Sequence, residues 1–284
     1  MAFLEVRDLS KSFPSPSGVR HVLRDVRLDV DQGEFVSIVG AMGSGKSTLL
    51  SLLAGLTTPD GGTVMLDGKA VAGVRDDAAF VFQNYSLLPW FSALENVRLA
   101  VQASFPEATA AEQKQRATTA LERVGLGNAI DRKPRQLSGG MRQRVSLARA
   151  FATEPRVLFL DEPFGALDAL TRDALQQDLA QLCAAVERPV TVVMITNSVE
   201  EAILLSDRIV PIVTGPPASL GASIAVELAR PRTLAQLAHD EQATHARAHV
   251  VAALTASMQR RPRPSTKSPP ALSATEPAKA SGQA

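Results

Sequence analysis

The segment GAMGSGKS, residues 40–47, restricts the possible folds of this chain more than any other feature. It fits the pattern G-x-x-x-x-G-K-S, in which backbone N–H groups wrap around phosphate oxygens and the lysine supplies a positive charge. It also lies between the apolar stretch EFVSIVG and the helix-like stretch STLLSLLAGL, a context that predicts a phosphate-binding α/β fold. The candidate ligand-binding residues are Gly40, Ala41, Met42, Gly43, Ser44, Gly45, Lys46, Ser47 and Thr48.

A pair of acidic residues follows a second apolar stretch. The segment RVLFLDEP places Asp161 and Glu162 at the carboxyl end of a predicted buried strand, where α/β sheets hold their ligands. Ser47 and Asp161 are suited to hold Mg²⁺, and Glu162 is suited to orient and deprotonate an attacking water. Two acidic residues alone would suit a simple turn, but the phosphate loop favours one shared site. The two motifs predict a P-loop ATPase or GTPase.

A third motif lies at the start of a predicted helix. In QLSGGMRQR, Ser138, Gly139 and Gly140 come directly before the helical stretch MRQRVSLARA. A serine hydroxyl and free helix N–H groups form an anion site. An ordinary helix cap, which stabilises by about 1 kcal/mol, has the same residue types. The spacing alone leaves both interpretations open.

Five motifs, in this order along the chain, resemble those of the ATP-binding subunit of ABC transporters over roughly residues 3–215. They are GAMGSGKST, VFQNYSLLPW, LSGGMRQR, VLFLDEPFGALD and ITNSVEEAILLSDRI. The resemblance implies an α/β P-loop (RecA-like) ATPase core with an N-terminal antiparallel β subdomain and an inserted α-helical subdomain. It also implies that the Ser138 segment of one subunit closes on the γ-phosphate held by a second, identical or related, subunit.

The resemblance also assigns roles to single residues. The phosphate-loop, magnesium and base positions of the family coincide with the residues named above, so ATP and Mg²⁺ are the expected cofactors. Gln83, at the end of FVFQ, matches a glutamine that senses Mg²⁺ and water, and Asp168 in GALD matches a loop that crosses between subunits. Phe13 lies where an aromatic ring commonly stacks on adenine, and a core position is the alternative.

One position departs from the family pattern. After the strand-like stretch TVVMIT the chain reads Thr196, Asn197, Ser198, where most family members have a histidine that touches the γ-phosphate. The Asn197 amide offers two N–H donors but cannot carry the charge of an imidazolium. Ser198 and Glu201 have capping-box spacing, so Ser198 should begin a helix and leave Asn197 free to face the nucleotide. We predict an active ATPase in which Asn197 positions phosphate; a non-hydrolysing regulatory subunit is the alternative.

The single tryptophan and the single tyrosine both lie in QNYSLLPWF, directly after Gln83. Aromatic clustering suits an apolar docking surface, and packing of the core against the helical insertion is the alternative. The resemblance implies that the segment from Tyr85 to Phe91 receives a cytoplasmic helix of a membrane permease. A periplasmic solute-binding protein is the further expected partner.

Composition limits the partners and the location. The 284 residues carry a net charge of +1, which gives no electrostatic reason to expect nucleic acid as a partner. No stretch approaches the roughly 20 apolar residues that a membrane-spanning helix needs, and the single Cys183 suits a reducing cytoplasm. We expect a peripheral protein on the cytoplasmic face of the bacterial inner membrane.

The chain divides into three predicted parts. An ATPase domain covers residues 1–230, with its helical subdomain near 86–155; residues 231–260 have helical composition; residues 261–284 are rich in Pro, Ser and Ala and predict a disordered tail. The amino-acid sequences of VFQNYSLLPW and of residues 204–221 are most similar to those of ATPases of importers for nitrate, nitrite, cyanate or bicarbonate. Sulfonate and taurine importers are the alternative, and the solute is assigned by resemblance alone.

Overall fold

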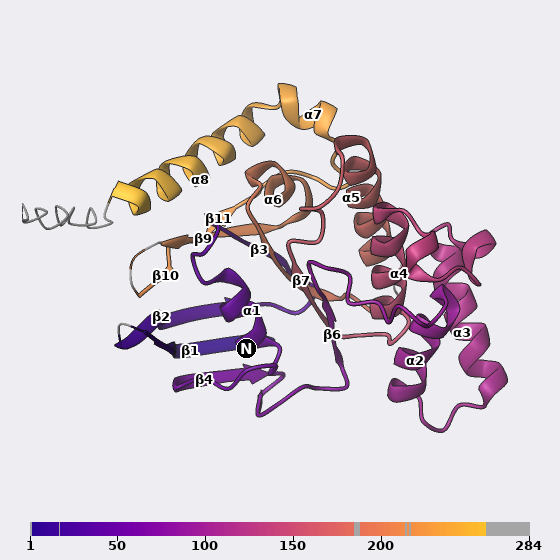
Figure 1. Ribbon diagram of the computed structural model, residues 1–284. Helices are drawn as coiled ribbons and strands as arrows, with labels where there is room; N and C mark the ends of the chain where they lie inside the picture. The colour runs from indigo at the N-terminus through magenta and orange to yellow at the C-terminus, as the bar shows by residue number, and fades with distance from the viewer. Residues whose placement is uncertain (1, 17, 185–187, 214, 216, 260–284) are drawn as a thin grey trace, which may run out of the picture.

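Two β-sheets form the centre of the computed structural model, which describes residues 2–16, 18–184, 188–213, 215 and 217–259. The larger sheet has the strand order β10-β9-β3-β8-β7-β6, with β11 beside β9 (Figure 1). Its strands are β3 (Phe35–Val39), β6 (Ala78–Val81), β7 (Val157–Asp161), β8 (Thr191–Thr196), β9 (Arg208–Val213), β10 (Ser219–Leu220) and β11 (Ile224–Ala225).

The central strands of this sheet are parallel and buried on both faces. Strand β3 pairs in parallel with β8 and β9, and β7 pairs in parallel with β6 and β8. Along β8, Val192 and Met194 face one core cluster, whereas Val193 and Ile195 face the other, as the alternation of side chains along a strand requires. The carboxyl ends of the strands therefore meet at one edge, where α/β sheets bind ligands.

The smaller sheet is antiparallel, with the order β2-β1-β4-β5. Its strands are β1 (Leu4–Ser15), β2 (Gly18–Val30), β4 (Gly61–Leu66) and β5 (Lys69–Ala70). Side chains from β1, β2 and β4 share a core cluster with α1 (Lys46–Leu53) and with one face of the larger sheet. This packing places the β1–β2 hairpin beside the phosphate loop.

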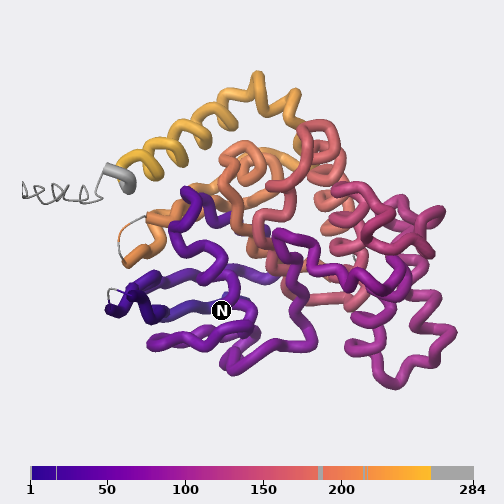
Figure 2. Tube along the Cα trace, viewed as in Figure 1, coloured from indigo at the N-terminus to yellow at the C-terminus, as the bar shows by residue number. Residues whose placement is uncertain are grey.

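Three helices lie between β6 and β7 in the sequence and form a core cluster of their own. They are α2 (Ala93–Ser104), α3 (Ala110–Arg123) and α4 (Gly139–Phe151), with short 3₁₀ turns at Gly127–Ala129 and Pro134–Gln136. Ser92 and Thr109 begin α2 and α3 with capping boxes that use Glu95 and Glu112, as S-x-x-E and T-x-x-E spacing predicts. In Figure 2 the magenta segment that forms these helices and the indigo N-terminal segment lie on opposite sides of the view.

The remaining helices cover the face of the larger sheet to which Val192 and Met194 point. They are α5 (Ala169–Ala184), α6 (Val199–Leu205), α7 (Leu234–His239) and α8 (Glu241–Gln259). Helix α8 packs against β9 and α6. Within the ranges given above, every helix is too short or too polar to cross a bilayer. The predicted tail at residues 261–284 lies outside the described part of the chain, and the division into three parts stays a prediction.

Candidate functional site

The phosphate loop joins β3 to α1, and three of its positions require glycine. Gly43 and Gly45 have φ angles of 74° and 95°, which side chains on L-residues disfavour. At Gly40 an added Cβ would lie 2.1 Å from Cγ2 of Ile212 on β9. The loop can therefore pass close to the sheet and reach the N-terminus of α1, where backbone N–H groups favour an anion.

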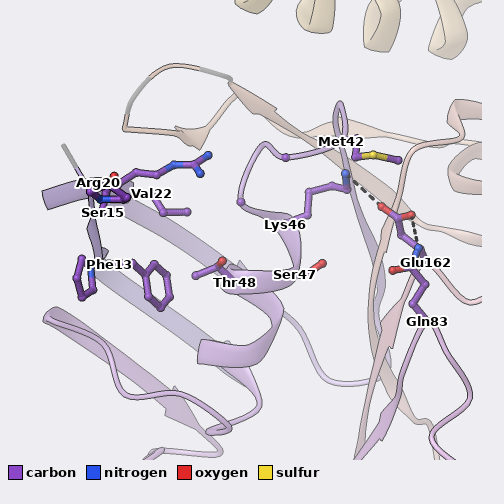
Figure 3. Close-up of a pocket in the computed structure, with 14 residues that line it drawn as sticks. Phe13, Ser15, Arg20, Val22, Met42, Lys46, Ser47, Thr48, Gln83 and Glu162 are labelled. Carbon is purple, nitrogen blue, oxygen red and sulfur yellow. Dashed lines mark hydrogen bonds and ion pairs between the residues drawn. The ribbon is translucent and has the colours of Figure 1, made fainter. Parts of the chain in front are cut away.

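Lys46 is a buried cation at the first turn of α1. Its side chain is 4% exposed, and Nζ donates to the carbonyl oxygens of Gly40 and Ala41 at 2.8 and 3.1 Å and to Oδ1 of Asn197 at 2.7 Å. The Glu162 carboxylate lies 3.4 Å from Nζ (Figure 3). Burial lowers the pKa of Lys46, and the attraction of Glu162 opposes that shift. A positive charge held mainly by neutral acceptors is suited to bind phosphate.

Two oxygen ligands lie together beside Lys46. The Ser47 hydroxyl donates to Oδ1 of Asp161 at 3.2 Å. Burial raises the pKa of Asp161, and the hydrogen bond from Ser47 partly opposes it. A hydroxyl and a carboxylate at a helix N-terminus are the donor set that Mg²⁺ uses in phosphate-binding sites, so these residues fit the predicted ion.

Glu162 has a strained backbone at the end of β7. Its φ of 42° lies in the left-handed region, and its N–H donates to the carbonyl of Ile195 on β8 at 3.0 Å. Gln83 Nε2 donates to Glu162 Oε2 at 3.3 Å, and Figure 3 shows the carboxylate between Gln83 and Lys46. Such strain at a cleft is typical of functional sites, and the turn aims the carboxylate at the phosphate loop.

A cavity of about 630 Å³ extends from the phosphate loop to the β1–β2 hairpin. Met42, Thr48 and Phe13 line it, and the Phe13 ring is 39% exposed with Lys11 Nζ 5.5 Å from its centroid. The core alternative for Phe13 is therefore wrong. Within the same loop the Ser44 hydroxyl is buried and has no hydrogen-bond partner among the described residues.

Sequence reasoning missed Arg20 and Val22, which also line this cavity. Arg20 pairs with Phe13 across the β1–β2 hairpin. That register follows several irregularities in the ladder, so local residue patterns gave no signal for it. The hairpin thus offers an aromatic ring and a guanidinium to a ligand that enters beside the loop.

The Ser138 segment borders a second hollow, of about 710 Å³. Ser138 begins α4 and its Oγ accepts from the N–H of Met141 at 3.2 Å, so the helix-cap interpretation holds. Gly139, Gly140 and Asp168 line this hollow. The Asp168 carboxylate accepts from the Thr171 N–H, which lowers the pKa of Asp168. Gln83 lines both hollows, but Lys46 and Ser138 line different ones within this chain.

The loop after β8 places Asn197 against Lys46. Ser198 begins α6 and its Oγ accepts from the Glu201 N–H at 3.2 Å, as predicted. The reciprocal half of the predicted capping box is wrong, because the Glu201 carboxylate accepts instead from Thr196 Oγ1 at 2.6 Å. Since Asn197 Oδ1 accepts from Lys46, its NH₂ group is left for another acceptor.

The segment from Tyr85 to Phe91 combines packing with exposure. Leu87 packs against the core of the helical subdomain, and the buried Asn96 bonds both backbone groups of Leu88. Trp90, by contrast, is 62% exposed. Sequence reasoning missed Arg149, whose guanidinium donates to the carbonyls of Tyr85 and Ser86. Packing therefore explains part of the aromatic cluster, while its role in docking stays a prediction.

The phosphate loop, the oxygen pair and the strained carboxylate together define a P-loop nucleotide-binding site. The sequence model of the family described as "ABC transporter" matches residues 23–165. The chain belongs to this family, as its motifs predicted.

Curated relatives include transport proteins of cyanobacteria. The bicarbonate transport ATP-binding protein CmpD of Synechocystis is 45% identical over 84% of this chain and 84% of its own length. The nitrate import ATP-binding protein NrtD of Synechococcus elongatus is 47% identical over 81% and 83%. The bicarbonate transport protein CmpC of the same species is 47% identical over 84% of this chain, which spans only 36% of CmpC.

Solved structures agree with this assignment. The dimeric ATP-binding cassette MJ0796, solved in a post-hydrolysis state bound to ADP and Pi, superposes with a TM-score of 0.70 at 32% identity. The match covers 80% of this chain and 100% of the cassette. The predicted fold class, an α/β ABC ATPase core with an antiparallel sheet and a helical insertion, is therefore confirmed.

Proposed function

We propose that this protein is the ATP-hydrolysing subunit of an importer for a small anion such as nitrate, nitrite, cyanate or bicarbonate. The observation that carries the proposal is the buried Lys46 ammonium, which lies between Glu162 and Asn197 at the end of the phosphate loop. Its neutral acceptors leave a positive site for the terminal phosphates of ATP. The names of the relatives supply the transport role.

The chain's own side chains fit ATP along the cavity. Phe13 lies at its hairpin end and is accessible for stacking on adenine. Backbone N–H groups of the loop and Lys46 would hold the phosphates. Ser47 and Asp161, with Gln83, would hold Mg²⁺, which when bound neutralises phosphate charge.

Glu162 is the proposed general base. Its carboxylate would accept a proton from a water whose oxygen bonds to the γ-phosphorus, while the bond from that phosphorus to the ADP oxygen breaks. Gln83, at 3.3 Å from Glu162, orients the carboxylate. Asn197 would donate its NH₂ group to a γ-phosphate oxygen because Lys46 already occupies its Oδ1. The retained carboxylate favours hydrolysis over the regulatory alternative.

The arrangement supports a nucleotide-sandwich dimer. Ser138, Gly139, Gly140 and Asp168 border a hollow that does not contain Lys46, so a second subunit, identical or related, would bring them to the phosphate. The dimeric state of the solved cassette supports the same assembly. Tyr85–Phe91, with exposed Trp90, is the proposed contact with a permease. The proposal includes a peripheral location on the cytoplasmic face of the inner membrane and a periplasmic binding protein in the same system.

The solute proposal follows the relatives. CmpD and NrtD carry bicarbonate and nitrate in their names, and this favours these anions over sulfonates and taurine. Uptake of nitrate, nitrite, cyanate and bicarbonate by cells lacking this gene tests the proposal. Loss of uptake for one of them, restored by the wild-type gene, supports it; normal uptake of all four contradicts the solute.

The biochemical test uses the purified full chain. We expect ATP binding and phosphate release, both lost in Lys46→Met. Lys69→Met is a matched control because Lys69 is an exposed lysine on β5. A wild-type protein that binds ATP but releases no phosphate, alone or with its permease, would establish the regulatory alternative.

A further inference from the structure

One buried residue, Glu201, bonds both neighbours of Asn197, Thr196 through its carboxylate and Ser198 through its backbone N–H. Thr196 Oγ1 donates to Glu201 Oε2 at 2.6 Å, and the Glu201 N–H donates to Ser198 Oγ at 3.2 Å. The Ser198 N–H in turn donates to Thr196 Oγ1 at 3.0 Å. Asn197 itself is exposed, so these bonds, which close on Glu201 from both sides, fix the backbone from which its amide reaches Lys46.

Glu201 is costly to bury, and its ion-pair partner Arg172 lies beyond hydrogen-bond length. It is 5% exposed, and burial raises its pKa while Thr196, Arg172 and Gln176 favour the charged form. Arg172 Nε lies 3.8 Å from Oε1, beyond hydrogen-bond length. The Arg172 Nε atom is buried without a hydrogen-bond partner among the described residues. A carboxylate in this setting stabilises a fold less than apolar packing would, which indicates a role other than stability.

Arg172 connects this carboxylate to the loop that follows Glu162. Its NH₂ group donates to the carbonyl of Leu167 at 2.9 Å, one residue before Asp168. The guanidinium therefore touches the end of the loop after β7, and its charge attracts the carboxylate that fixes the loop after β8. The loops that carry Glu162 and Asn197 both reach Lys46.

We propose that Glu201 and Arg172 are positioning residues for hydrolysis: they keep Asn197 in contact with Lys46 and fix its position relative to the loop that carries Glu162. This inference rests on the function proposed above. Glu201 touches no reacting atom and acts through the backbone of Asn197. Its effect should therefore appear at the γ-phosphate and not where the rest of the nucleotide binds.

The test substitution is Glu201→Gln. Glutamine keeps the backbone N–H that caps α6 and an amide oxygen for Thr196, but it removes the charge that attracts Arg172. We expect kcat to fall about tenfold, since displacing a positioned group by about 1 Å costs up to 100-fold. Affinity for ADP, which has no γ-phosphate, should stay unchanged. Glu122→Gln is the matched control, because Glu122 is an exposed glutamate on α3 of the helical subdomain.

A double-substitution cycle separates positioning from general stability. In an Asn197→Ala background, Glu201→Gln should cause no further loss of kcat, because the residue through which it acts is gone. Additive losses, or a fall in ADP affinity in Glu201→Gln, would overturn the proposal. If Glu201→Gln does not fold, Arg172→Gln serves in the same cycle with the same expected result.

A second measurement keeps this inference distinct from the proposed function. Absence of ATP hydrolysis by the wild-type chain would contradict the function alone. The ratio of affinities for a non-hydrolysable ATP analogue and for ADP still reports the γ-phosphate contact, and Glu201→Gln should lower that ratio several-fold. An unchanged ratio in Glu201→Gln, beside a lowered ratio in Asn197→Ala, would overturn the positioning role.

Discussion

Two aspartates lie at opposite ends of neighbouring strands, and their surroundings shift their pKa values in opposite directions. Asp77 directly precedes β6, and Arg75 donates to both of its carboxylate oxygens at 2.8 and 2.7 Å. These bonds lower the pKa of Asp77. Asp161 ends β7, where burial raises its pKa and Ser47 offers one bond of 3.2 Å. The same residue type is stabilised as an anion at one edge of the sheet and destabilised at the other.

Other charged residues differ in the same way between the amino ends of the strands, the amino edge, and their carboxyl ends, the carboxyl edge. At the amino edge, Arg208 forms a two-bond ion pair with Glu34, at 2.6 and 2.9 Å. At the carboxyl edge, Lys46 is buried among carbonyl and amide oxygens, and Glu162 has a left-handed backbone. A buried lysine and a partly buried carboxylate with a raised pKa persist where a ligand uses them. One edge therefore holds the sheet together, while the other gives up stability for binding.

The largest expected effect is the loss of hydrolysis in Glu162→Gln. The amide keeps the shape of the side chain but cannot accept a proton, so the rate should fall at least about 100-fold. ATP binding should persist, because Lys46 and the loop remain. Phosphate release and nucleotide affinity measure the two quantities. A variant that keeps more than half of the wild-type rate would remove Glu162 from the role of base.

Asn197 should show the next effect. Replacing it with alanine removes one donor to phosphate and frees Lys46, which we expect to lower kcat by about tenfold to a hundredfold. The free energy of unfolding should change little, since the Asn197 side chain is exposed. A loss of stability comparable to the loss of rate would place Asn197 with the amino edge in this comparison.

Asn197→His tests the missing titratable group directly. An ordinary histidine has a pKa of about 6.5, so the variant should hydrolyse ATP with a rate that changes between pH 6 and 8. The wild-type rate should vary little over this range because an amide does not titrate there. Parallel pH profiles of kcat for the two proteins measure the difference. Superimposable profiles would show that position 197 does not contact the reacting phosphate.

Local sequence patterns predicted the parts of the site that depend on neighbouring residues. The loop at residues 40–47 requires glycines at fixed spacing, and Ser92 with Glu95 has the spacing of a helix start. Longer-range features gave no such signal. Arg20 reaches the cavity only through the register of the hairpin. The capping-box spacing predicts that the Glu201 carboxylate bonds the Ser198 N–H, but in the folded chain this carboxylate accepts from Thr196 Oγ1.

The amino edge should respond in stability and not in rate. Arg208→Met removes both bonds to Glu34 and the bond to the Asp29 carbonyl, while Glu34 keeps the bond from the Asp31 N–H. We expect this to lower the free energy of unfolding by about 1 to 1.5 kcal/mol. Arg208→Lys keeps the charge but not the two-bond geometry, so it should cost less. Urea unfolding of the three proteins measures the series. A tenfold fall in ATP hydrolysis by Arg208→Met would contradict the claim that the amino edge serves stability and not catalysis.

Asp77→Asn should give the smallest effect, with a defined pH dependence. The Arg75 bonds hold the pKa of Asp77 below its ordinary value, so the ionised carboxylate stabilises the fold above the ordinary aspartate pKa of about 3.9. This stabilisation is lost as the pH falls through the lower, folded-state pKa. Because Asp77 is partly exposed, the difference between wild type and variant should be about 0.5 kcal/mol at pH 7. It should shrink as the pH falls below the ordinary aspartate pKa and through the lower pKa of the folded state. Equal differences at pH 3 and pH 7 would mean that packing, and not the paired charge, makes this edge stable.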